Sequence, residues 1–350
     1  MLEDLAKRYK GKNVLVLGIG GGGDVVSTVP IAGALERLEI RPIVGSIMWE
    51  RFAFDPVPGP IRAEELVGAE QVNSCAAWIK PGSYAVRGGR KVTPQAARVA
   101  AFTMEGRVLG VDVSSGAIGV AEGLDEILRK LGADLVFGID AGGDILAEGA
   151  EETLWSPLAD QLMLATLFRL TEKGHRAIIG VHGIGADGEL DPSNLLARIS
   201  LIAEKGGYLG ARGLTNYDVD LLEGVLKSAV TEASALPVKA AKGVVGKVRM
   251  REGTRHVDLS IVTSLTFFLD VRVLYNECPM AKAIYRSGSL REVREILNGL
   301  GVYTELDLEE DLKALLDRGE AINETSTMRV RREGRERLTK KAWRREPKIK

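Results

Sequence analysis

The chain has 350 residues, of which 45% are hydrophobic and 5% aromatic, and its formal net charge is −1 at pH 7. No apolar run reaches the roughly 18 residues of a membrane span, and the charged segment 1–12 lacks the apolar core of a secretory signal. Two cysteines, Cys75 and Cys278, are too few for a disulfide framework or a cysteine-based zinc site. We therefore expect a cytoplasmic protein without membrane contacts, and its 27% of charged residues is typical of a thermophile.

The charge is concentrated at the C-terminal end. Residues 329–350 hold 11 lysines and arginines against 3 acidic residues, so this segment carries +8 and the rest of the chain −9. An acidic body argues against general nucleic-acid binding. We predict a single folded domain over 1–325 and a flexible basic tail over 326–350, through which alone RNA, DNA or an acidic partner would bind.

Apolar runs alternate with amphipathic segments through the first part of the chain. The predicted elements are strand 14–18, helix 24–38, strand 41–48, helix 93–104, strand 107–113, helix 116–131 and strand 134–139. A proline-rich loop at 55–60 and an irregular stretch at 61–93, with short strands near Val72 and Tyr84, interrupt the alternation.

The alternation continues in the second part. Here the predicted elements are helix 156–173, strand 176–181, helices 193–205 and 216–230, a hairpin of 247–250 with 256–262, strand 265–274, and helices 279–286, 289–298 and 307–317. Helices between apolar strands predict an α/β fold with a Rossmann-like, mostly parallel sheet and helices on both faces. A β-hairpin extension and C-terminal helices complete the predicted fold.

A run of glycines and an aspartate follows the first strand. It consists of Gly18, Gly20, Gly21, Gly22, Gly23 and Asp24. Glycine lets a ligand approach the backbone closely, and the amides at the start of the following helix favour anions. The loop therefore predicts a site for a phosphate, a phosphorylated small molecule or a nucleotide.

The same glycines match the G-x-G-x-x-G fingerprint of dinucleotide-binding proteins, with Glu50 at the end of the next strand to bind the ribose. Glu50 lies farther along than the usual spacing of about 20 residues. Asp24 would also repel a bare pyrophosphate, unless a divalent cation lies between them. The alternative is that Asp24 only caps its helix. NAD(P) is therefore the second choice of ligand, and the Walker-type phosphate loop is absent.

Carboxylates also follow the strand at 134–139. Asp140 and Asp144 bracket Gly142 and Gly143, in a tight turn that can present oxygens to Mg²⁺ while the glycines admit a ligand. With Asp24 they form the predicted metal site. The alternative is that Asp144 caps the segment that follows it.

Other candidate residues lie at the ends of neighbouring strands. Trp49 can stack on a base, and Arg51 can neutralise charge on a phosphate. His182 and Asp187 follow strand 176–181 and are candidates for proton transfer. Asp160 faces the same crevice or complements its helix dipole. Because the carboxyl ends of parallel strands share one edge, we expect a common pocket there.

Five motifs together resemble the mostly archaeal family called domain of unknown function 1152. They are Gly20-Gly-Gly-Gly-Asp24, Trp49-Glu-Arg51, Asp55-Pro-Val-Pro-Gly-Pro60, Asp140-Ala-Gly-Gly-Asp144 and Ser156-Pro-Leu-Ala-Asp160. The resemblance covers most of the chain before the basic tail. It implies a cytoplasmic archaeal protein with one α/β domain, and it implies no reaction.

The expected function is thus an enzyme, a transferase or hydrolase, that binds a nucleotide or phosphorylated small molecule with Mg²⁺. An NAD(P)-dependent oxidoreductase that uses Glu50 is the first alternative. A non-catalytic ligand-binding or interaction protein is the second. The sequence is compatible with a homo-oligomer and does not determine the oligomeric state.

Overall fold

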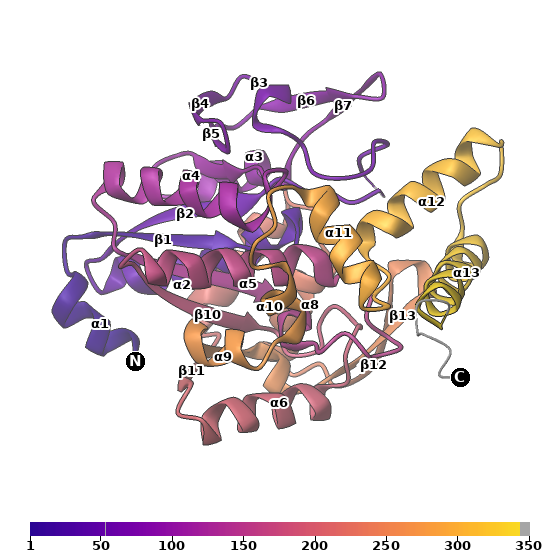
Figure 1. Cartoon of the computed structure of the whole chain (residues 1–350). Coiled ribbons are helices and arrows are strands. Elements are labelled where there is room, and N and C mark those ends of the chain that lie inside the picture. Colours follow the sequence, from indigo (N-terminus) through magenta and orange to yellow (C-terminus); the bar gives the residue numbers. More distant parts are fainter. Residues whose placement is uncertain (53, 344–350) are drawn as a thin grey trace.

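The computed structural model of the chain describes residues 1–52 and 54–343. Its centre is a nine-stranded sheet with helices on both faces (Figure 1). From one edge to the other, the strands are β11 (Tyr208–Gly213), β14 (Leu265–Asp270), β10 (Arg176–His182), β9 (Leu135–Ala141), β1 (Asn13–Gly18), β2 (Arg41–Ile47), β8 (Val108–Val111), β5 (Ala76–Ile79) and β4 (Glu70–Asn73).

The five central strands, β10, β9, β1, β2 and β8, run parallel to one another, and the strands toward both edges pair antiparallel. Counted in chain order among themselves, the five parallel strands lie in the order 3-2-1-4-5, which is that of a doubly wound sheet. The order reverses between β1 and β9. Ligands of such sheets bind in the crevice at the carboxyl ends of the strands at this point.

The two faces of β1 show how the sequence builds both layers. Leu15 and Leu17 belong to a core formed with α4 (Gly116–Leu131) and α5 (Pro157–Glu172). Val14 and Val16 alternate with them and pack on the opposite face, against α1 (Leu2–Tyr9) and α2 (Val25–Arg37). A continuous apolar run is needed because both faces of the strand are buried.

The other helices are grouped around these layers and at the C-terminal end. They are α3 (Gln95–Val99), α6 (Pro192–Glu204), α7 (Asn216–Leu226), α8 (Leu236–Ala241), α9 (Val271–Asn276), α10 (Pro279–Ile284), α11 (Leu290–Gly299), α12 (Glu305–Asp317) and α13 (Glu324–Trp343). Two small antiparallel units lie outside the main sheet. One is the hairpin of β12 (Gly246–Met250) with β13 (Arg255–Leu259), and the other joins β3 (Leu66–Val67), β6 (Tyr84–Arg87) and β7 (Arg90–Val92).

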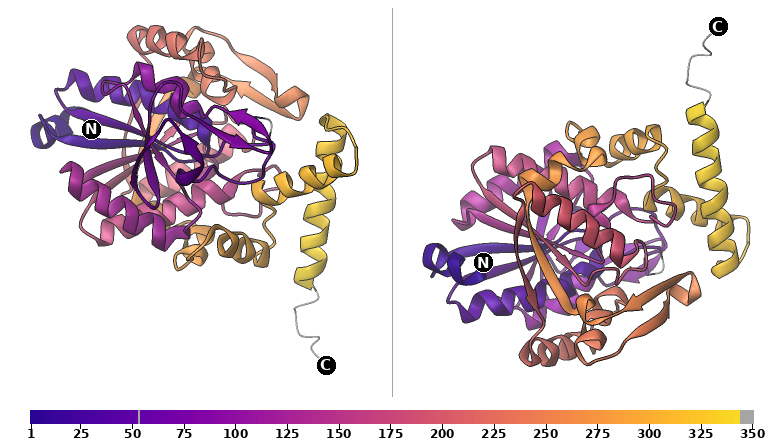
Figure 2. Two further views of the ribbon diagram at one scale, coloured as in Figure 1. Left: turned by 90° about the horizontal axis from the view of Figure 1, so that it is seen from above. Right: turned by 90° about the horizontal axis from the view of Figure 1, so that it is seen from below.

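Helices α12 and α13 lie at the end of the molecule opposite α1, on the side toward which β1 points (Figures 1 and 2). Helix α13 contains the first residues of the predicted basic tail, and it docks on the body because Arg331 donates hydrogen bonds to the carbonyl oxygens of Glu152 and Leu154. Residues 344–350 of that tail lie outside the described residues. Among the described helices, none has both the length and the apolarity to cross a membrane.

The predicted α/β fold class is confirmed, with the mostly parallel sheet, the hairpin and the C-terminal helices in their expected places. One predicted strand is shorter than expected. The strand at 265–274 ends at Asp270, whose side chain accepts hydrogen bonds from the amides of Arg272 and Val273 and so starts α9. Strands β5 and β11 were not predicted, and both pair within the main sheet.

Candidate metal centre

The loops after β1 and β9 are joined by one side chain. Asp24 lies in a short 3₁₀ helix, Gly22–Asp24, just before α2. Its Oδ2 accepts a hydrogen bond from the Gly20 amide at 2.8 Å and a longer one from the Ala141 amide at 3.4 Å. The glycine loop and the end of β9 therefore meet at this carboxylate, at the point where the strand order reverses.

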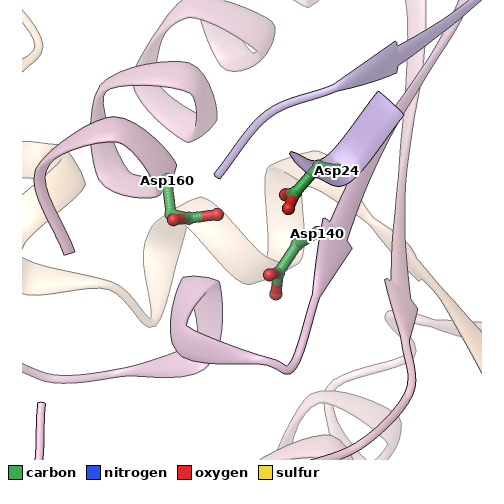
Figure 3. Close-up of side chains that lie close together, drawn as sticks. All are labelled: Asp24, Asp140 and Asp160. Atoms are coloured by element: carbon green, nitrogen blue, oxygen red, sulfur yellow. The ribbon is translucent and has the colours of Figure 1, made fainter. Parts of the chain in front are cut away.

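Asp140 and Asp160 complete a group of three carboxylates around this point. Asp140 lies near the end of β9 and Asp160 in the first turn of α5, and each of the three offers an oxygen within 4.8 Å of the others. Figure 3 shows the three side chains gathered from three separate elements around one space. Asp140 and Asp160 are fully buried, and within the described part of the chain their four carboxylate oxygens have no hydrogen-bond partner.

Unpaired carboxylates in such a place resist ionisation. Burial raises the pKa of Asp24 from 3.8 to about 7. Burial also raises the pKa of Asp160 well above its usual value, and the charges of Asp140 and Asp24 raise it further. A buried group of this kind is costly unless a proton or a cation compensates it.

The glycines of the loop make room for these carboxylates. A Cβ atom at Gly20 would lie 2.7 Å from Oδ1 of Asp160 and 2.8 Å from Oδ2 of Asp24. A Cβ at Gly22 would lie 2.5 Å from Oε1 of Glu50. Gly20 and Gly22 are therefore needed because acidic side chains pack against the backbone of the loop, which the sequence did not indicate.

Half of the loop amides already have acceptors. The Gly20 amide donates to Asp24, and the Gly22 amide donates to the Trp49 carbonyl at 2.9 Å. Among the described residues no acceptor faces the amides of Gly21 and Gly23. Both amides are therefore available as hydrogen-bond donors. Gly18 plays a packing role, because a Cβ there would lie 2.7 Å from the backbone of Asp24.

A second acidic group lies beside the first. Asp144, Asp187 and Glu189 offer oxygens within 4.8 Å of one another, and all three are buried. Glu189 is paired with Arg255 at 2.9 Å. Gly142, at φ 122°, allows this arrangement because a Cβ there would lie 2.2 Å from the Asp187 carboxyl carbon. The predicted metal ligand Asp144 thus belongs to this second group, while Asp160 takes its expected place beside Asp24 and Asp140.

Arg51 brings positive charge to the first group. Its guanidinium donates to the Gly20 carbonyl, pairs with Glu305 at 3.2 Å and lies over the Trp49 ring at 4.7 Å. Its backbone has φ 59°, a left-handed conformation that residues with side chains adopt at a cost of about 1–3 kcal/mol. The chain tolerates this strain because the surrounding contacts hold the guanidinium at the glycine loop.

Members of both groups line one cavity of about 720 Å³, in which Asp140 is not a lining residue. The basic lining residues are Arg51, Arg90, Arg251 and Arg255, and the acidic ones are Asp24, Asp144, Asp160, Asp187, Glu189, Glu50, Glu232, Glu305, Glu309 and Glu324. Apolar side chains form part of the wall, namely Phe52, Phe54, Leu308, Leu312, Leu316 and Ile322. The cavity therefore combines acidic, basic and apolar surfaces.

Several predicted site residues lie in or beside this cavity. Glu50 lines it, with Oε1 accepting from the Gln95 amide at 3.0 Å. Trp49 also lines it, and its indole nitrogen donates to Glu309 at 3.0 Å. Gly143, at φ 116°, packs instead against Leu195, where a Cβ would lie 3.0 Å from the leucine.

His182 is placed differently. Its fully buried ring has Nδ1 at 2.8 Å from the Thr266 hydroxyl, on the neighbouring strand β14, and it is not part of the cavity lining among the described residues. Burial lowers the pKa of His182 to about 4, so the ring is neutral at physiological pH. The structure does not bring it together with Asp24.

Sequence reasoning missed three acidic residues of the site. Glu189 accepts from the Trp155 and Ser156 amides, and Glu305 accepts from the Leu158 and Ala159 amides at the start of α5. Glu309 accepts from Trp49 and from the Gly59 amide. Nothing in the local sequence of α12 distinguishes Glu305 and Glu309 from surface glutamates, because their partners lie more than a hundred residues away in the chain.

The fold and site define a doubly wound α/β protein with an acidic, arginine-lined cavity where its strand order reverses. Residues 15–313 match the model of the family described as protein of unknown function, DUF1152, and the chain belongs to that family. No curated protein and no solved structure matches the chain significantly.

Proposed function

We propose that the protein is an enzyme that binds a nucleotide or another phosphorylated small molecule through Mg²⁺ at Asp24, Asp140 and Asp160. One observation carries the proposal: Asp140 and Asp160 are fully buried, lack hydrogen-bond partners within the described chain and lie close to Asp24. The donor set consists of oxygen atoms alone, which suits a hard divalent cation. Such an ion would provide the charge that this acidic group needs.

The surroundings of the three carboxylates suit a phosphate. The cation would screen their negative charge, the free amides of Gly21 and Gly23 would donate to phosphate oxygens, and Arg51 would offset charge that develops on them. Asp187 lines the same cavity, and in the metal-free protein burial raises its pKa to about 7. His182 has no role in the proposal. A transferase or hydrolase reaction fits these parts.

The cavity has room for more than a phosphate. A volume of about 720 Å³ lies within the range of small-molecule sites, about 300–1,000 Å³. Phe52, Leu308 and Leu312 form an apolar wall, and exposed Phe54 and Leu316 extend it toward solvent. We propose that this wall holds the organic body of the ligand, such as a base or an apolar chain.

An NAD(P)-dependent oxidoreductase fits less well, although Glu50 stands beside the glycine loop at the end of β2. Its pyrophosphate would face Asp24, Asp140 and Asp160 without a counter-ion. The cytoplasmic location, the archaeal origin and the non-catalytic alternative stay predictions.

The proposal is tested by thermal unfolding with ATP, ADP, NAD, NADP and FAD, each with and without Mg²⁺. A ligand at 100 times its dissociation constant adds about 2.7 kcal/mol, which corresponds to about 4 °C for a chain of this length. We expect stabilisation by a phosphorylated ligand that requires Mg²⁺ and is lost in Asp160→Asn. Asp220→Asn, at an exposed position on α7, is the matched control. An equal shift by NAD with and without Mg²⁺ would favour the oxidoreductase.

A further inference from the structure

The second acidic group, Asp144, Asp187 and Glu189, is not needed to hold one cation at Asp24. It nevertheless lines the same cavity as Asp24 and Asp160 of the first group. Asp144 is four residues beyond Asp140 in the same turn, and both carboxylates are buried. The two groups are therefore electrostatically one acidic region with two sets of oxygens.

The members of the second group differ in how far they are already engaged. Glu189 accepts from the amides of Trp155 and Ser156 and is paired with Arg255, so its oxygens are largely used. Asp187 is 6% exposed, and its Oδ1 accepts from the Glu189 amide. Its other oxygen, Oδ2, is buried without a partner in the described structure. Asp144 accepts from the Ser156 hydroxyl at 3.2 Å.

The net charge of the two acidic groups favours two bound divalent cations over one. The two groups contain six carboxylates, and in the described structure Glu189 alone among them forms an ion pair. Five ionised carboxylates would leave three negative charges beside a single divalent cation. Two cations would leave one. Buried charge that is left uncompensated is strongly unfavourable.

We propose that the cavity binds two divalent cations, one at Asp24, Asp140 and Asp160 and the other at Asp144 and Asp187. Glu189 acts as a positioning residue, because it holds the loop before α5 and pairs with Arg255, which donates to the Asp187 carbonyl. This inference rests on the proposed function, since it adds an ion to the same site. Paired cations suit reactions at phosphorus, where they stabilise the attacking and the leaving oxygen together.

The test uses Mn²⁺ as the probe with the full-length chain. Equilibrium dialysis counts the bound ions, and low-temperature electron paramagnetic resonance reports whether two Mn²⁺ ions are magnetically coupled. We expect two ions per chain and a coupled spectrum for the unmodified protein and for Asp220→Asn. Asp187→Asn and Asp144→Asn should each retain one ion and give an uncoupled spectrum, and their metal-free unfolding curves check that both variants fold.

The outcomes separate this inference from the proposal on which it rests. One uncoupled Mn²⁺ ion in the unmodified protein, lost in Asp160→Asn, would overturn the second site and leave the proposed function standing. Two ions retained in both Asp187→Asn and Asp144→Asn would also overturn the second site. No Mn²⁺ bound at millimolar concentration would overturn both.

Discussion

Replacing Asp24 by asparagine should make the metal-free protein more stable at pH 8. The substitution keeps an oxygen that can accept from the Gly20 amide, and it removes a negative charge close to Asp140 and Asp160. The effect follows from the pKa of Asp24, which burial raises from 3.8 to about 7. A shift of this size corresponds to about 4 kcal/mol when the group is fully ionised. This value is an upper bound because Asp24 keeps part of its surface in contact with solvent.

The stability difference between the variant and the unmodified protein should depend on pH. Between pH 4 and 7 the folded protein holds a proton on Asp24 that the unfolded chain has released, so stability falls as the pH rises through this window. Below pH 4 both states are protonated, and the substitution should have almost no effect. Above pH 7 the gain in the asparagine variant should level off. At this chain length about 4 kcal/mol corresponds to a rise of about 5 °C in melting temperature.

Calorimetric unfolding in EDTA at pH 4, 6 and 8 measures this prediction, with Asp220→Asn as the control. Added Mg²⁺ should reverse the order at pH 8, because the unmodified protein is then stabilised and the variant is not. A variant that is destabilised equally at pH 4 and pH 8 in EDTA would refute the reasoning. In that case Asp24 would stabilise the loop through its hydrogen bonds, and its negative charge would not lower the stability of the folded protein.

The remaining predictions concern the glycine loop, the arginine that faces it and the histidine. Gly20→Ala should abolish Mg²⁺-dependent stabilisation and lower the free energy of unfolding by about 1–3 kcal/mol, because its Cβ would overlap Asp160 and Asp24. Isothermal titration with Mg²⁺ measures the first effect, and chemical denaturation measures the second. Glu305→Gln should destabilise the fold by about 3 kcal/mol, because it removes the buried partner of Arg51, and unchanged urea unfolding would contradict this expectation. His182→Asn should leave the dissociation constant of any Mg²⁺-dependent ligand unchanged, and a tenfold change would place the ring in the site.

The layered fold could be read from the sequence because its signals are local. The apolar run of β1 and the amphipathic pattern of α4 each lie within one element, and Pro157 marks the start of α5. Strand β11 escaped prediction because its sequence, Tyr208–Gly213, contains glycines and an arginine and has little apolar alternation. It pairs with β14 as the outermost strand, where tertiary pairing outweighs strand propensity.

The candidate site was predictable in part for the same reason. Asp140 lies at the carboxyl end of β9 and Asp24 in the loop that follows β1, so their meeting follows from the parallel sheet. The division of the acidic residues into two groups does not follow from the parallel sheet. It depends on where α5 places Asp160 and where the loop after β10 places Asp187. Gly142 illustrates the limit: its sequence context suggests approach to a ligand, whereas its open side is filled by the Asp187 carboxylate.

Glu305 joins distant parts of the chain, since it caps the start of α5 and pairs with Arg51. During synthesis on the ribosome, the whole sheet emerges before this glutamate does. The α5 amides and the Arg51 guanidinium therefore lack this partner until Glu305 has left the ribosome. A premature stop codon between positions 271 and 305 would yield a product that retains all the sheet strands but cannot complete the cavity, and such a product would be a ready substrate for cellular proteases.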